Sequence, residues 1–72
     1  MNRDYTILNA LLREAERGSD WAFAAAWAKL REARRALASP GWIMLAGQPA
    51  ADKLRTAIAA GDARLEQIGA ER

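Results

Sequence analysis

The residues best able to bind a charged ligand are four cations in one short segment. Lys29, Arg31, Arg34 and Arg35 lie within seven residues, and Glu32 is the one carboxylate among them. Residues three or four apart share a helix face, so the three arginines are expected to lie together, with Lys29 off that face. Arginine binds carboxylates and phosphates with two parallel hydrogen bonds. The cluster indicates a surface for an acidic protein, a nucleotide or a nucleic acid. The alternative is a solvated helix face on which Glu32 pairs with Arg35.

The sequence offers little for catalysis or metal binding. It contains no histidine and no cysteine, so the commonest general acid–base, the thiol nucleophile and the usual zinc ligands are absent. Ser19 and Ser39 are the only serines, and each stands where a helix cap is expected. Asp62 and Glu66 are four residues apart and are expected to form a solvated surface pair. We therefore expect a non-enzymatic protein with no catalytic residue, no metal site and no cofactor.

A second set of candidate binding residues is apolar. Residues 42–45 are consecutive large apolar residues, so a helical turn points them in every direction and one core cannot take them all. Trp27 is expected in the core. For Trp21 and Trp42, burial in the core and a place in an interface are equal alternatives. The predicted hydrophobic interface comprises Trp21, Trp42, Ile43, Met44 and Leu45.

These residues must be positioned by helices. Apolar residues recur three and four positions apart, which predicts helices at about 4–17, 20–38 and 50–69. A short helical turn is expected at 40–46, bounded by proline and glycine. β-Branched residues are scarce and never alternate with polar ones, so no strand is predicted. Gly61 could break the last helix, but the apolar spacing crosses it in phase, so one helix bent near Gly61 is expected.

Each expected helix carries an apolar stripe for the core. Alanines make the start of the second helix slim, which allows another helix to approach closely. The expected stripes are Tyr5, Leu8, Leu12 and Ala15, then Phe23, Trp27, Leu30, Ala33 and Leu37, and finally Leu54, Ile58, Gly61, Leu65 and Ile68.

The length of 72 residues predicts a single helical domain, residues 1–72. A chain this short has a small core and usually needs a disulfide, a structural metal or a second copy of itself. The first two are excluded by composition, which leaves a second copy or unusually good helix packing. The sequence therefore predicts an all-α fold: a small three-helix antiparallel bundle with a short helical turn before the last helix, completed by dimerisation or a higher oligomer.

Charge and hydropathy limit which partners and which cellular compartment are expected. Eleven basic and nine acidic residues give a net charge of +2, which is mild for a nucleic-acid-binding protein. No stretch approaches the ~20 apolar residues of a membrane span. Residues 1–6 are polar and precede no apolar signal segment. We expect a cytoplasmic protein that does not enter a membrane.

Three functions fit these features. The first is a protein–protein interaction module, a small regulator, inhibitor or adaptor that covers a site on a larger protein. The second is nucleic-acid or nucleotide binding through the arginine face, which has to weaken steeply with salt. The third is a structural subunit of a phage or secretion assembly.

Overall fold

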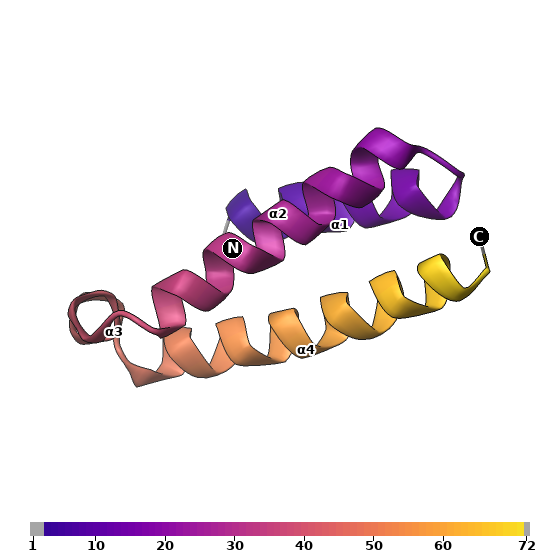
Figure 1. The fold of residues 1–72 in the computed structure, drawn as a ribbon. Helices are drawn as coiled ribbons and strands as arrows, with labels where there is room; N and C mark the ends of the chain where they lie inside the picture. Colours follow the sequence, from indigo (N-terminus) through magenta and orange to yellow (C-terminus); the bar gives the residue numbers. More distant parts are fainter. Residues whose placement is uncertain (1–2, 72) are drawn as a thin grey trace.

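The computed structural model describes residues 3–71, and these residues contain four helices (Figure 1). They are α1 (Arg3–Glu16), α2 (Asp20–Leu37), α3 (Pro40–Ala46) and α4 (Gln48–Ala70). These residues contain no strand, which confirms the all-α prediction, and the bounds lie within two residues of those expected. None of the four described helices has both the length and the apolar character needed to cross a membrane.

Capping residues set the helix ends. The Ser19 hydroxyl accepts a hydrogen bond from the Ala22 N–H at 3.2 Å, and the Ser39 hydroxyl accepts one from the Trp42 N–H at 3.4 Å. Each bond satisfies a backbone donor that the first turn of a helix leaves unpaired. Gly18 has a φ of +102°, a left-handed conformation that lets the chain leave α1 and enter α2. Both serines are therefore caps, as predicted.

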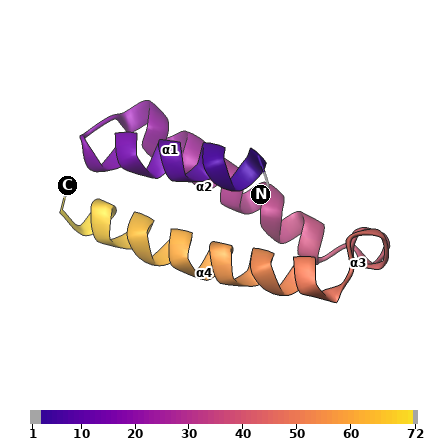
Figure 2. The same cartoon turned by 180° about the vertical axis from the view of Figure 1, so that it is seen from behind.

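The three long helices pack side by side, and α3 connects two of them at one end. The short link between α1 and α2 folds them against each other, and α4 returns along both (Figures 1 and 2). The molecule is elongated, with dimensions of 39 × 21 × 16 Å. Because α1 begins part-way along the molecule, the half nearest α3 contains only α2 and α4 as long helices. Completion of the fold by a second copy stays a prediction.

The core side of α2 differs from the expected stripe. Ala22, Ala26 and Leu30 are completely buried, whereas Phe23 and Trp27 are only half-buried at the edge of the core. The two rings pack edge to face, with their centroids 6.4 Å apart. The alanines face inward because their small side chains let the other helices approach most closely. Trp27 thus packs against the core without lying inside it, which corrects its expected place.

Gly61 allows α4 to approach α2. A Cβ atom at this position would lie 3.0 Å from Cδ2 of Leu30 and 3.3 Å from its Cδ1. The helix crosses Gly61 without a break, so the choice of a single last helix is confirmed. The expected α4 seam is confirmed too, since four members are buried and one is half-buried: Ile58, Gly61, Leu65 and Ile68, with Leu54 at the edge.

Candidate partner-binding surfaces

The cationic cluster of α2 is divided between the fold and the solvent. Arg34 forms an ion pair with Asp62 of α4, so it bridges the two helices. Lys29 lies 3.8 Å from Glu32, measured from Nζ to Oε2. The expected pairing of Glu32 with Arg35 is therefore wrong, and Arg34 does not belong to one free face with the other two arginines. Arg34 therefore lies on the flank of α2 that faces α4, because its partner Asp62 belongs to α4.

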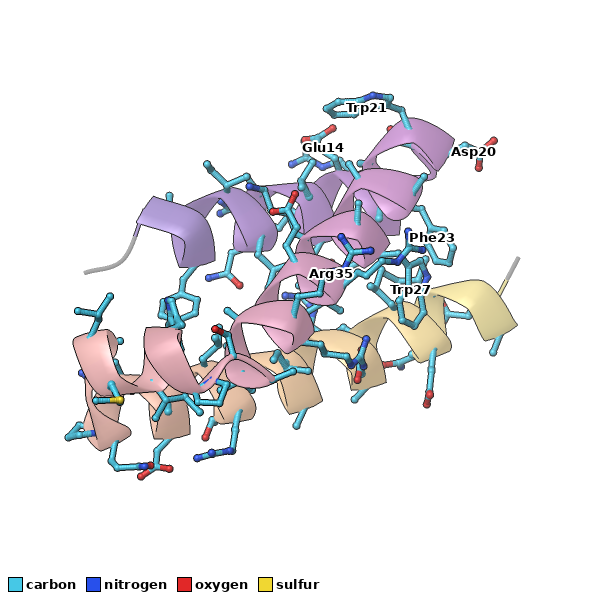
Figure 3. The ribbon with its side chains drawn as sticks, turned by 60° about the vertical axis from the view of Figure 1, so that its left-hand side comes forward. Glu14, Asp20, Trp21, Phe23, Trp27 and Arg35 are labelled. Atoms are coloured by element: carbon cyan, nitrogen blue, oxygen red, sulfur yellow. The ribbon has the colours of Figure 1, made fainter. Side chains whose placement is uncertain are left out.

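Arg31 and Arg35 form the part of the cluster that stays free. Because 3.6 residues make one turn, these two positions lie opposite the inward-facing Ala22 and Ala26. Both side chains are exposed, and no carboxylate in residues 5–71 forms an ion pair with either. Figure 3 shows Arg35 projecting from α2. We call this pair the Arg31–Arg35 face, and its charges are not used to hold the described fold together.

Asp62 is a connection between helices and not half of a solvated pair with Glu66. Its side chain is 26% exposed, against 48% for that of Arg34. Its second oxygen, Oδ1, is buried and accepts no hydrogen bond from the described residues. Among the described residues, Arg34 is therefore the hydrogen-bond and ion-pair partner of this carboxylate. Sequence spacing could not reveal the pair, because its members are 28 positions apart.

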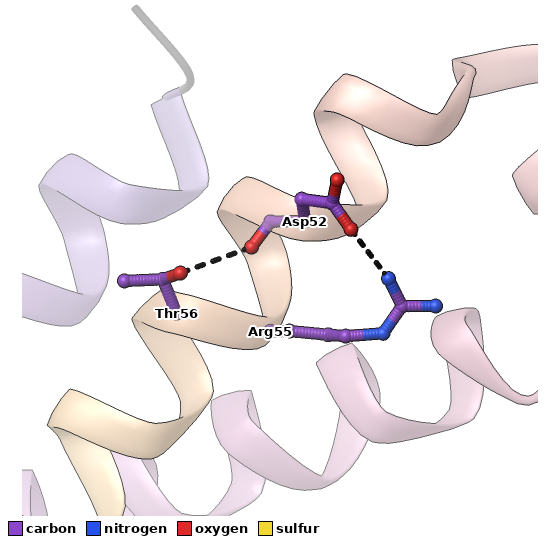
Figure 4. Close-up of polar contacts among 3 residues, drawn as sticks. All are labelled: Asp52, Arg55 and Thr56. Carbon is purple, nitrogen blue, oxygen red and sulfur yellow. Dashed lines mark hydrogen bonds and ion pairs between the residues drawn. The ribbon is translucent and has the colours of Figure 1, made fainter.

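Other arginines are held by carboxylates on their own helix or beside it. The Arg55 Nη1 group donates to Asp52 Oδ1 at 2.7 Å, one turn away on α4, and the Thr56 hydroxyl donates to the Asp52 carbonyl at 3.1 Å (Figure 4). Arg17 likewise donates to Glu14 at 3.1 Å near the end of α1. Pairs of this kind on an exposed helix contribute at most a few tenths of a kcal/mol, about 0.3–0.5 each. They nonetheless leave these arginines less available than the Arg31–Arg35 face.

The predicted hydrophobic interface is split between the two ends of the molecule. On α3, Met44 and Leu45 are 85% and 91% exposed, whereas Trp42 and Ile43 are partly buried. The helix contacts both α2 and α4. Trp21 is 75% exposed, but it lies at the start of α2, far from α3 (Figures 1 and 3). Trp21 therefore belongs neither to the core nor to the surface formed by Met44 and Leu45.

Two hollows lie between the helices, and Tyr5 and Leu8 of α1 line both of them. The first, of about 200 Å³, lies between α2 and α4, and Trp42 of α3 is among its lining residues. The second, of about 400 Å³, is a groove between α1 and α4. Arg64 lines this groove, and its Nε donates a hydrogen bond to Glu16 of α1 at 3.1 Å. The sequence analysis did not predict either hollow. The available signal was helix length, because α1 has 14 residues and α4 has 23, so α1 cannot cover α4 along its whole length.

No group of three or more acidic side chains in the described residues could hold a metal ion, and five of the described carboxylates accept from or pair with nearby cations. Outside these pairs lie exposed cations and apolar side chains, together with the exposed carboxylates of Glu66 and Glu71. Comparisons with protein-family models, with curated proteins and with solved structures found no match.

The Arg34–Asp62 pair should be energetically coupled, whereas Arg35 and Asp62 should not. We expect a double-mutant cycle of Arg34→Ala and Asp62→Asn to give a coupling of about 1 kcal/mol, the upper end for partly exposed pairs. The matched cycle with Arg35→Ala should give a coupling near zero. Urea unfolding followed by circular dichroism measures both. Equal coupling in the two cycles would contradict the division of the cluster.

Proposed function

We propose that the chain is a non-enzymatic protein-binding module that covers an acidic site on a larger partner, as a regulator, inhibitor or adaptor. The observation that carries this proposal is the Arg31–Arg35 face, where two exposed guanidinium groups lie one turn apart and have no ion-pair partner in residues 5–71. The other cations of α2, Lys29 and Arg34, have carboxylate partners. The face therefore carries charge that the fold does not need.

Arginine suits this role for two physical reasons. Its planar guanidinium matches a carboxylate with two parallel hydrogen bonds, and it is weakly hydrated, so it loses less on leaving water than lysine does. Arginine is also enriched among the few residues that supply most of the free energy of protein binding. Two arginines on one rigid helix face are held at a fixed spacing, which lowers the conformational entropy lost when both bind carboxylates.

Nucleic-acid or nucleotide binding is the alternative use of the same face, because phosphates also accept from arginine. Two free arginines at one place make few phosphate contacts, whereas nucleic-acid affinity depends on many. The net charge of +2 adds little to long-range attraction. A protein partner with paired carboxylates is therefore the better match to this surface.

Removal of both arginines should weaken binding to an acidic polypeptide. A fluorescent peptide of alternating glutamate and serine serves as the probe, with a DNA duplex of equal charge beside it, both measured by anisotropy. We expect Arg31→Gln/Arg35→Gln to lose about tenfold in peptide affinity or more, equivalent to about 1.4 kcal/mol. Arg17→Gln/Arg55→Gln is the control, because it removes the same charge from arginines that are already paired.

Two results would contradict this assignment. Equal losses in the two double variants would mean that the peptide senses net charge alone. Tighter binding of the duplex, with a steep salt dependence, would support the nucleic-acid alternative.

We further propose that the α3 end binds a second copy of the chain. Residues 36–51 contain no charged residue, and the α3 segment exposes Met44 and Leu45 at the end of the molecule. A twofold contact places the same patch of both copies together, so an uncharged apolar patch meets no like charge there. Burial of these two side chains removes apolar surface from water in each copy.

Replacement of the two exposed α3 side chains should abolish self-association. We expect sedimentation equilibrium to give twice the mass of a single chain, and Met44→Ser/Leu45→Ser to give a single chain with unchanged helix content. Trp21→Ser is the control, because Trp21 is exposed at the opposite end. A monomer at every concentration would contradict the proposal, and a discrete large assembly would favour the structural-subunit alternative.

A further inference from the structure

The groove between α1 and α4 is a second surface with a defined chemistry. Its floor is apolar: Leu8 and Leu12 of α1 are almost completely buried there, and Ala57 and Ala60 of α4 lie beside them. Asn9 and Thr56 are polar residues of its lining. Tyr5, Leu8 and Ala57 line both this groove and the hollow beside Trp42, so the two adjoin. The groove runs along helices and not across them. An elongated apolar hollow of about 400 Å³ beside a helix accommodates the apolar side chains of another helix.

The charges around this groove are unequally compensated. Arg64 lines it and is held by Glu16, so that pair is neutral. Lys53 lines the groove, and Arg13 lies beside Arg64 at its far end; both are exposed, and neither forms an ion pair with a carboxylate of residues 5–71. No carboxylate lines the groove itself. The charge left uncompensated at its edge is therefore positive.

We propose that the α1–α4 groove binds an acidic amphipathic helix of a partner protein. The apolar face of that helix packs against the accessible lining residues Tyr5, Ala57 and Ala60, and carboxylates on its flanks pair with Lys53 and Arg13. A second copy of the chain is a poor occupant, because a twofold contact through this groove brings the same uncompensated cations toward each other. The inference rests on the proposed protein-binding role, but not on the Arg31–Arg35 face, which lies on the outer side of α2.

Two matched peptides test this inference. Both are amphipathic helices of about 18 residues with the same leucine stripe. Glutamates flank the stripe in one peptide, and lysines flank it in the other. Each is titrated into the isotopically labelled full chain, and amide chemical shifts are followed by NMR. We expect the glutamate peptide to shift the amides of Leu8, Asn9, Ala57 and Ala60, and to bind at least about tenfold more tightly than the lysine peptide.

Charge reversal at the groove then separates this site from the other one. Arg13→Glu/Lys53→Glu should reverse the preference between the two peptides, whereas Arg31→Glu/Arg35→Glu, with the same change in net charge, should preserve it. Both variants change exposed side chains, and circular dichroism checks that helix content is retained. Loss of the preference in the second variant alone would overturn the groove while leaving the Arg31–Arg35 proposal intact.

Three other results would also overturn the inference. These are equal affinity for the two peptides, shifts confined to α3 or to the outer side of α2, and shifts of groove amides that grow with protein concentration before any peptide is added. The last result would identify a second copy as the occupant.

Discussion

The close approach of α2 and α4 at Leu30 and Gly61 sets the spacing on which the other contacts depend. Leu30 is completely buried, and its δ-carbons occupy the space that a Cβ at position 61 would enter. Glycine at the centre of a helix costs about 1 kcal/mol relative to alanine, so its place in the α4 seam needs a compensating contact. The Leu30 side chain provides that contact. Ala22 and Ala26, toward the start of α2, are completely buried as well.

The same spacing decides which cations are free. Asp62 follows Gly61 directly, so the short distance between the helices brings its carboxylate within reach of Arg34. Arg31 and Arg35 lie on the opposite side of α2 and meet no carboxylate of residues 5–71. Packing therefore sorts one sequence cluster into a structural arginine and two that are available to a partner. Function is proposed for the residues that packing leaves unused.

Periodicity predicted the helices and the α4 seam well, because spacings of three and four follow directly from helix geometry. It misplaced the core face of α2, since Phe23 and Trp27 are more hydrophobic than alanine, yet the crossing favours small side chains. The partner of Arg34 depends on tertiary structure that no local pattern encodes. The same holds for α3, where contact with α2 and α4 determines that Trp42 turns inward while Leu45 points to water.

The packing of Leu30 against Gly61 is tested most directly by combining Gly61→Ala with Leu30→Val, which removes the crowding δ-carbons. In the Leu30→Val background, Gly61→Ala should raise the free energy of unfolding by about 1 kcal/mol, the gain expected from helix propensity. In the native background, crowding against the δ-carbons should cancel most of that gain. Urea unfolding of the four proteins gives the coupling. An equal effect of Gly61→Ala in both backgrounds would contradict the account.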